Sequence, residues 1–169
     1  MTNKLEMKLC GDLVLRQTCE PVAEITDDLL ATLDEMVAMM DAQNGVGLAA
    51  PQVGFLSRFL VMMDPDTKTV YRMINPEITS FSDKKCTLEE GCLSVLGKDG
   101  LPVFSDVSRP ESVTVEWTNE KGERIGAQMS GLPARIVQHE TDHLDGVLFI
   151  DYLSPVRREM VMRKVKKRK

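Results

Sequence analysis

Two histidines, His139 and His143, are the residues of this chain best suited to chemistry, and the sequence contains no others. They are four residues apart, and Glu140 directly follows the first. On a helix, positions i and i+4 share one face, so both imidazoles can bind one metal ion while the glutamate lies next to it. Random placement of two histidines and a glutamate produces this pattern in roughly one sequence in a thousand. The spacing therefore predicts a metal site on a helix.

A catalytic site of this kind normally has three protein ligands and one position for water. Because there is no third histidine, the third ligand must be Cys, Asp or Glu. Asp145 and Asp151 follow the helix, but neither has the spacing of the common metallopeptidase ligands. Cys92, in the run Glu90-Gly91-Cys92-Leu93-Ser94, is the best thiolate, although burial as an inert side chain is the commoner role of a cysteine. The other cysteines are predicted to be structural: Cys10, Cys19 and Cys86.

The composition predicts one globular domain. The chain has 169 residues, of which 43% are hydrophobic and 28% charged, and no apolar run approaches the roughly 20 residues of a membrane span. The N-terminus has no apolar stretch after its basic residue, so we expect no secretory signal. Four cysteines without an export signal indicate a reduced, cytoplasmic protein with no membrane partner.

The charge is unevenly distributed along the chain. Residues 157–169 contain eight basic residues and one acid, a net charge of +7, which leaves −12 on residues 1–156. A basic tail can bind nucleic acid, but a solvated terminal helix is the simpler interpretation of the charge alone. We expect residues 1–156 to form a single catalytic domain and residues 157–169 to form a basic C-terminal helix or tail of that same domain.

The spacing of apolar residues predicts which elements position these side chains. An irregular arm over residues 12–22 comes first, and residues 95–108 are expected to form a long loop with at most a short edge strand. The order is that of an α+β fold, with antiparallel or mixed strands packed around a central helix that carries the His-Glu-x-x-His motif, and a C-terminal helix. Helices are predicted over 26–43, 130–144 and 154–165, and strands over 58–63, 69–74, 113–117 and 124–129.

Three blocks of the sequence together resemble peptide deformylases of the bacterial type, in the class with a C-terminal helix. The first runs from Gly45 to Gln52 and reads Gly-Val-Gly-Leu-Ala-Ala-Pro-Gln. The second is Glu90-Gly91-Cys92-Leu93-Ser94, and the third runs from Gln138 to Gly146. They occur in the family's order with compatible spacing, and the resemblance extends over most of the chain.

The resemblance implies a hydrolase that removes the N-formyl group from the formyl-methionine of newly made polypeptides and releases formate. By similarity, Cys92, His139 and His143 bind one divalent metal ion, with water as the fourth ligand. A divalent ion lowers the pKa of its water toward about 7, so hydroxide forms near neutral pH and attacks the formyl carbon. The family favours Fe(II), while Zn(II), Ni(II) and Co(II) are alternatives for this ligand set.

By the same resemblance, Glu140 is the general base that takes a proton from the water and then delivers one to the leaving amine. The tetrahedral intermediate carries an oxyanion, and the family stabilises it with two hydrogen-bond donors. In this chain those donors are expected to be the amide of Gln52 and the backbone N–H of Leu93.

The family binds its peptide as an added strand with the methionine side chain in an apolar pocket. Arg109 and Asp142 match an ion pair of the family that braces the helix and the cysteine strand. The residues expected to bind the peptide or form its pocket are Val46, Gly47, Leu88, Glu90, Leu132, Arg135 and Ile136.

The sequence departs from the family pattern next to the expected cleft. Leu96 stands where the family usually has proline, and the segment from 96 to 108 is longer than in the shorter bacterial members. Arg135 stands where some members have an apolar residue, so we expect it at the rim of the pocket or in contact with the peptide.

Two other classes of function compete with a deformylase. A zinc peptidase could use the same helix, but familiar peptidases take their third ligand from downstream histidine or glutamate. A purely structural metal site takes four protein ligands and does not require Glu140 beside the metal. The resemblance also suggests that the basic tail docks on the ribosome, where formylated chains emerge, through neutralisation of RNA phosphates.

Overall fold

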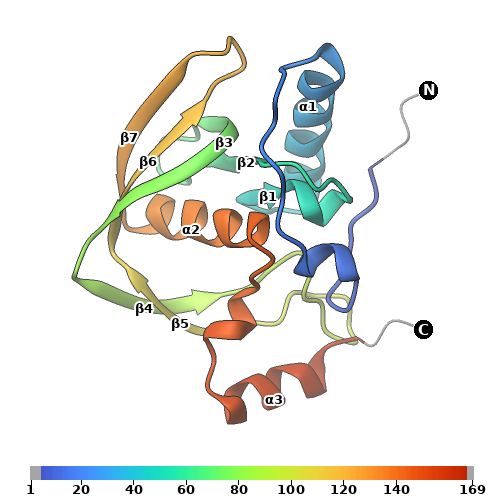
Figure 1. Ribbon diagram of the computed structural model, residues 1–169. Helices are drawn as coiled ribbons and strands as arrows, with labels where there is room; N and C mark the ends of the chain where they lie inside the picture. The colour runs from blue at the N-terminus through green and yellow to red at the C-terminus, as the bar shows by residue number, and fades with distance from the viewer. Residues whose placement is uncertain (1–4, 167–169) are drawn as a thin grey trace.

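The computed structural model describes residues 5–166 (Figure 1). The longer helices over these residues are α1 (Asp27–Ala42), α2 (Leu132–Leu144) and α3 (Pro155–Lys164), and single 3₁₀ turns cover Leu13–Arg16, Ala50–Val53 and Phe149–Tyr152. The strands are β1 (Gly47–Ala49), β2 (Phe59–Met63), β3 (Val70–Phe81), β4 (Lys85–Glu90), β5 (Ser105–Pro110), β6 (Ser112–Thr118) and β7 (Arg124–Ser130).

Helix α2 lies at the centre of the molecule. A five-stranded antiparallel sheet of order β1-β2-β3-β6-β7 curves around it, and the antiparallel pair β4-β5 lies on its other side, as Figure 1 shows. Helix α1 covers the β1-β2 end of the large sheet, and α3 lies beyond β5 at the far end of the molecule. The predicted α+β architecture, with a central motif-bearing helix and a C-terminal helix, is confirmed.

Helix α1 follows directly from its sequence. The hydroxyl of Thr26 accepts a hydrogen bond from the backbone N–H of Leu29 at 3.2 Å, which caps the first turn. Leu33, Met36 and Met40 recur at three- and four-residue steps and are fully buried against the sheet. The methionine stripe is therefore core packing.

Helix α2 is unusual because it is buried on most of its surface yet carries many polar residues. It begins after Gly131, which has a positive φ of 64°, and Pro133 occupies its first turn. Buried polar groups need partners, so a cluster of this size on one helix indicates a functional site. The buried polar residues of α2 are Arg135, Gln138, His139, Glu140, Thr141 and His143.

Two hydrophobic cores flank the central helix. The larger joins α1, the five-stranded sheet and the apolar positions of α2. The smaller lies beneath the cysteine segment and is closed by α3, and its members include Leu15, Cys92, Val95, Val103, Phe149, Val161 and Val165. Most of α3 remains exposed, so its attachment depends on Val161 and, just after its end, Val165.

The predicted boundaries of α1, α2, α3, β2, β6 and β7 are confirmed to within two residues. The strand predicted over 69–74 instead continues to Phe81 as β3, with irregular register around Pro76, which has no N–H to donate. The irregular arm over 12–22 contains the 3₁₀ turn Leu13–Arg16. None of the helices within residues 5–166 is long and apolar enough to cross a membrane.

Strand β4 was not predicted, and the expected loop over 95–108 gives way to β5 at Ser105. The sequence of β4, Lys-Cys-Thr-Leu-Glu-Glu, has only two apolar residues, and all but its last residue are exposed or half-buried. It is a strand because it pairs along its whole length with β5, a long-range contact that a local pattern does not show.

The turn after α2 gives a stability prediction. Gly146 has φ of 72°, and a Cβ there would lie 2.8 Å from the backbone of Arg16. Gly122 has φ of 81°, but nothing lies within 4 Å of the same added atom. We expect Gly122→Ala to lower the free energy of unfolding by about 1 kcal/mol through backbone strain alone, and Gly146→Ala by about 2–3 kcal/mol because the clash adds to it. Chemical denaturation measures both changes, and equal losses would contradict the packing at Gly146.

Candidate metal centre

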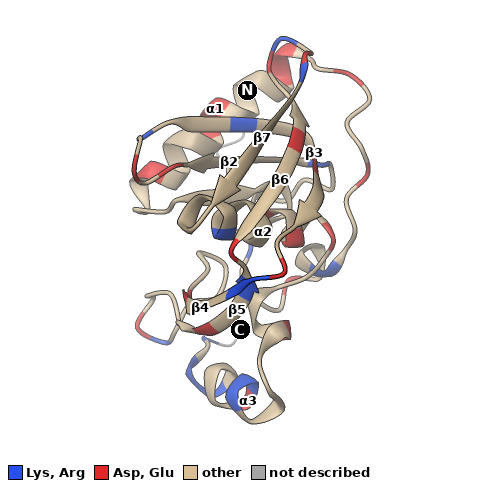
Figure 2. Ribbon diagram, turned by 90° about the vertical axis from the view of Figure 1, so that its left-hand side faces the viewer, with Lys and Arg blue, Asp and Glu red and all other residues tan. Residues whose placement is uncertain are grey.

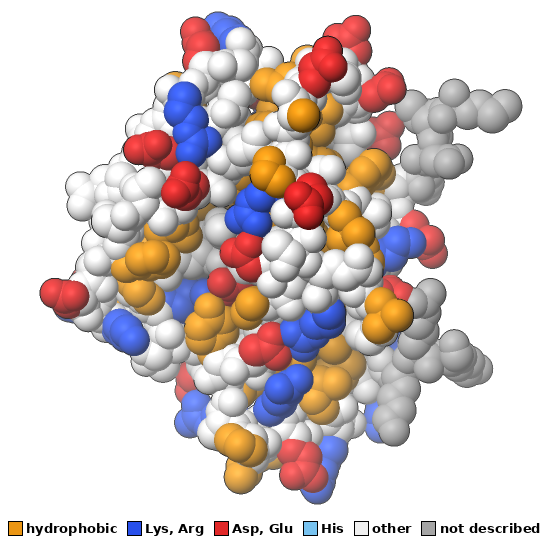
Figure 3. Space-filling view, viewed as in Figure 1, with side chains coloured by type: hydrophobic (Ala, Val, Ile, Leu, Met, Phe, Trp, Pro, Cys, Tyr) orange, Lys and Arg blue, Asp and Glu red, His pale blue; other side chains and the backbone are white. Residues whose placement is uncertain are grey.

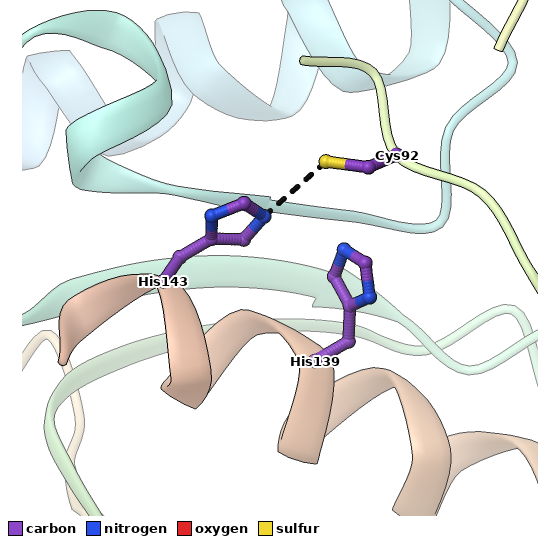
Figure 4. Close-up of side chains that lie close together, drawn as sticks. All are labelled: Cys92, His139 and His143. Carbon is purple, nitrogen blue, oxygen red and sulfur yellow. Dashed lines mark hydrogen bonds between the residues drawn. The ribbon is translucent and has the colours of Figure 1, made fainter. Parts of the chain in front are cut away.

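Cys92, His139 and His143 come together although they lie on two separate segments (Figure 4). Cys92 follows the end of β4, while both histidines project from one face of α2. One possible ligand atom from each lies within 4.8 Å of the other two, and the sulfur of Cys92 is 3.3 Å from Nε2 of His143. All three residues are buried. The structure thus brings the three predicted metal ligands into one cluster.

The orientation of His139 is set by Glu90, the last residue of β4. A Glu90 carboxylate oxygen lies 3.1 Å from Nδ1 of His139, which leaves Nε2 of that ring as the nitrogen free to bind a metal. Burial by itself raises the pKa of Glu90, but hydrogen bonds from His139 and Arg109 lower it to about 2. The carboxylate therefore stays charged at neutral pH.

Arg109, on β5, links this carboxylate to α2. Its guanidinium pairs with Glu90 and, at 2.8 Å, with Asp142. Tyr152 donates a hydrogen bond of 2.9 Å to Asp142, and the guanidinium carbon of Arg109 lies 4.6 Å from the centre of the Tyr152 ring. The predicted ion pair between Arg109 and Asp142 is therefore present in the structure, and it connects α2 to the β4-β5 sheet.

Arg135, which the sequence predicted at the rim of the pocket or in contact with the peptide, is held by hydrogen bonds within the protein. It is buried, and one nitrogen lies 2.8 Å from Glu90 and 2.9 Å from the carbonyl oxygen of Val107. A second nitrogen donates to the carbonyl oxygen of Cys86 at 2.6 Å. Its hydrogen bonds hold β4, β5 and Glu90 together, and the residue also lines the cavity next to the cluster, so its contact with the peptide stays a prediction. Two guanidiniums thus flank a single buried carboxylate.

Glu140 lies beside the cluster with one carboxylate oxygen unused. Among the described residues, its Oε2 has no hydrogen-bond partner although the side chain is buried. Its other oxygen lies so close to Gly47 that any Cβ there would overlap it, which explains the glycine at that position. Burial raises the pKa of Glu140 to about 7. A carboxylate of that pKa can accept and release a proton near neutrality.

The two histidines differ electrostatically. Burial opposes the charged form of His139, but hydrogen bonds with Cys92 and Glu90 outweigh it and raise its pKa. Burial and the nearby charge of His139 lower the pKa of His143. The second ring is therefore held neutral, the form in which imidazole binds a metal.

Gln52 approaches the sulfur of Cys92 from the opposite side of the site. Its carbonyl oxygen accepts a hydrogen bond from the backbone of Ala49 at 2.8 Å, which fixes the orientation of the amide. Its nitrogen donates to Ser94 at 3.1 Å and lies 3.5 Å from the Cys92 sulfur. The donor end of the amide thus points toward the metal ligands.

A cavity of about 250 Å³ opens onto the cluster. Cys92, His139, Glu140 and Gln52 lie in its wall. Of the predicted peptide-binding residues, those that line it are Val46, Gly47, Glu90, Leu132, Arg135 and Ile136, together with Leu93.

Leu88 is the predicted pocket residue that this cavity does not include. It lies on β4 with 46% of its surface exposed. The further lining residues that the sequence did not predict are Gln43, Asn44, Gly45, Glu89, Gly91, Pro102 and Phe104. Pro102 and Phe104 belong to residues 96–108, the segment in which the sequence departs from the family pattern. That departure was the feature of the sequence that could have pointed to these two residues.

The residues of the cluster fit a divalent transition metal. A thiolate and two imidazoles form a donor set that suits zinc or ferrous iron. Oε2 of Glu140 is buried without a partner among the described residues, as expected of a group placed beside a metal-bound water. Three protein ligands and an adjacent carboxylate match a catalytic site better than a structural one.

Comparison with known proteins gives a consistent assignment. Residues 5–159 match the family model of polypeptide deformylase. The chain is 43% identical to a peptide deformylase of Thermodesulfovibrio yellowstonii over 169 residues, covering 98% of both proteins. It is 42% identical to one of Endomicrobium trichonymphae over 167 residues, 98% of this chain and 96% of that protein.

Solved structures agree with this assignment. A peptide deformylase from Synechococcus elongatus, in complex with actinonin, superposes with a TM-score of 0.87 at 36% identity and covers 98% of this chain and 88% of that one. One from Legionella pneumophila has a TM-score of 0.87 at 38% identity, over 95% of this chain and 92% of that one. With the fold and three ordered motifs in agreement, the chain belongs to the peptide deformylase family, whose members are metal-dependent enzymes.

Proposed function

We propose that this protein removes the N-formyl group from the initiator formyl-methionine of newly made polypeptides and releases formate. The observation that carries the proposal is the buried cluster of Cys92, His139 and His143 at the wall of a cavity, with the unpaired carboxylate oxygen of Glu140 beside it. The family membership supports the same reaction.

Cys92, His139 and His143 hold the metal in this proposal. When bound, a divalent ion acts as a Lewis acid and lowers the pKa of a water molecule toward neutrality. Glu90 keeps the His139 ring oriented, and Arg109 keeps Glu90 charged and in place. The metal proposed for the active enzyme is Fe(II).

Glu140 moves the protons of the reaction. Its free Oε2 takes a proton from the water that attacks the formyl carbon, and the resulting carboxylic acid delivers a proton to the leaving amine. A pKa of about 7 suits both steps, because neither the loss nor the gain of the proton is then strongly unfavourable near neutral pH.

Two donors stabilise the negative oxygen that develops on the formyl group. The Gln52 amide nitrogen already points at the site, where it lies 3.5 Å from the Cys92 sulfur. The backbone N–H of Leu93 follows the cysteine in the cavity wall. Each such donor typically contributes about 3 kcal/mol of transition-state stabilisation.

The peptide lies in the cavity with its methionine side chain against apolar residues. Val46, Leu132 and Ile136 supply that surface, and Gly47 lines the cavity where its backbone would form strand-like hydrogen bonds with the peptide. Glu90 and Arg135 support the site through their mutual ion pair, and both line the cavity in which the peptide would lie.

We further propose that the enzyme works in the cytoplasm on nascent chains and that residues 1–156 and 157–169 form one domain with a basic C-terminal part. Basic side chains are concentrated on α3 at one end of the molecule (Figures 2 and 3). Positive charge at this end supports a ribosome contact through RNA phosphates. Part of this charge, on Lys167, Arg168 and Lys169, lies outside the described residues.

The role of Glu140 is tested by substitution. We expect Glu140→Gln and Glu140→Ala to lower kcat for formate release from formyl-Met-Ala by about 10²- to 10⁴-fold, because neither side chain can accept the proton. Bound metal, measured by elemental analysis, should remain near one per chain. Formate release at an unchanged rate would contradict the mechanism, and cleavage of an unformylated peptide by the wild type would favour a peptidase.

The identity of the metal is tested by preparation without oxygen. We expect anaerobic protein loaded with Fe(II) to be active and to lose activity in air, because iron beside a thiolate at a cavity wall promotes oxidation of Cys92. Mass spectrometry of the aerated enzyme should locate added oxygen on Cys92. Full, air-stable activity with zinc alone would rule out the preference for iron.

The ribosome contact is tested by removal of charge. Because Val161 and Val165 are buried, truncation of α3 would damage the second core, so substitution is the better design. We expect the triple change Arg163→Gln, Lys164→Gln, Lys166→Gln to weaken co-sedimentation with ribosomes about tenfold or more near 0.1 M salt, because fewer phosphates are neutralised. A matched control neutralises three exposed lysines elsewhere, Lys68, Lys85 and Lys121. Equal co-sedimentation of the two variants would reject the proposal.

A further inference from the structure

The segment after Cys92 is folded on itself as a small hairpin. The backbone N–H of Val103 donates to the carbonyl oxygen of Val95 at 3.0 Å, and that of Gly97 donates to Leu101 at 2.7 Å. Leu96 and Pro102 form an antiparallel bridge between these bonds. We call residues 95–104 the cleft hairpin because Pro102 and Phe104, near its C-terminal end, line the cavity.

Residues 164–166, which we call the chain end, add a third segment to this hairpin. The N–H of Lys98 donates to the carbonyl oxygen of Lys164 at 3.1 Å, and the N–H of Lys166 donates to that of Leu96 at 2.9 Å. Gly97 and Val165 form the antiparallel bridge between them. Figure 1 shows the C-terminal end of α3 next to this hairpin.

Side chains reinforce the backbone pairing. Val165 is only 5% exposed and packs in the second core with Val95, Val103 and Val161. The chain end is therefore held by buried apolar contacts on one side and backbone hydrogen bonds on the other. Loss of either is expected to release the hairpin.

The other end of the hairpin forms part of the cavity wall. Pro102 and Phe104 line the cavity, and Phe104 is 57% exposed. The Phe104 ring packs on the backbone of Gly91, where a Cβ would lie 2.6 Å from a ring carbon. Phe104 thus presents a large apolar surface beside the metal ligands, and its position depends on the hairpin.

We propose that Val165 and Lys166 are positioning residues for peptide binding: they pair with residues 96–98 and thereby hold Phe104 in the wall of the substrate cavity. The proposal rests on the proposed function, because the occupant of the cavity is taken to be the formylated peptide. It gives the chain end a role in the cleft that does not depend on its charge.

The metal ligands have supports outside the hairpin. The carbonyl oxygen of Ser94, two residues after Cys92, accepts a hydrogen bond from the N–H of Cys10 at 2.6 Å. Gln52 contacts both the Cys92 sulfur and the Ser94 hydroxyl. Loss of the chain-end pairing should therefore affect peptide affinity much more than the chemical step.

The test compares Lys166→Pro with Lys166→Ala. Proline removes the N–H that donates to Leu96, and the preceding Val165 already has the extended backbone (φ −64°, ψ 134°) that a residue before proline favours. Alanine removes the same charged side chain but keeps the N–H. With formyl-Met-Ala-Ser as substrate, we expect Lys166→Pro to raise KM by about five- to tenfold with kcat within about twofold of the wild type, and Lys166→Ala to leave both unchanged.

A second background shows whether the effect acts through the cavity wall. Phe104→Ala should raise KM by itself, and adding Lys166→Pro to it should raise KM by less than about twofold more, because the side chain that was positioned is gone. Additive effects, or a loss confined to kcat, would overturn the proposal.

Hydrogen exchange provides a readout that does not depend on activity. Lys166→Pro should speed amide exchange in peptides covering residues 96–104 by about tenfold, roughly the worth of one hydrogen bond, with exchange in α2 unchanged. Unchanged exchange at the hairpin would also overturn the proposal. If the wild type released no formate, the proposed function would fail, and the exchange result would still decide whether the chain end holds the hairpin.

Discussion

The site depends on the buried carboxylate of Glu90. It lies between the guanidiniums of Arg109 and Arg135, and it also contacts the ring of His139. These three partners come from β5 and α2, so one side chain of β4 joins both elements to its own strand beside the metal ligands. Removing one partner of such a buried pair typically costs about 3–5 kcal/mol, because the other charge is left without compensation. Charge balance therefore both holds the fold together here and fixes the geometry of the ligands.

The same requirement explains why α2 can be both polar and central. Several of its buried polar groups have partners that support the fold: Arg135 bonds to two strands, and Gln138 donates to the carbonyl oxygen of Pro110. On the cavity face, Glu140 keeps one oxygen free. The contrast separates the groups that hold the helix from the group that can react. Gly47 allows that separation, because any side chain there would occupy the space of the Glu140 carboxylate.

The second core connects the chemistry to the end of the chain. Cys92 belongs to it, and so do Val161 and Val165 from α3 and its continuation. The segment around Cys92 is consequently packed between α2 and α3. The C-terminal segment thus has a packing role in addition to its positive charge, since its backbone pairs with the hairpin that borders the cavity. The contacts that hold residues 164–166 are therefore the same contacts that hold the hairpin beside the cavity.

The sequence by itself determined the local features: the helix of α2, its two histidines one turn apart, the capped helix α1, and the three ordered motifs that indicate the family. These depend on residues close together in the chain. Only the tertiary structure decided that β4 is a strand, that Leu88 does not line the cavity, and that Arg135 is buried against Glu90. It also decided which residues the end of the chain contacts. Such outcomes depend on which distant segments pack together and on how buried charges find partners, and no local periodicity encodes that choice.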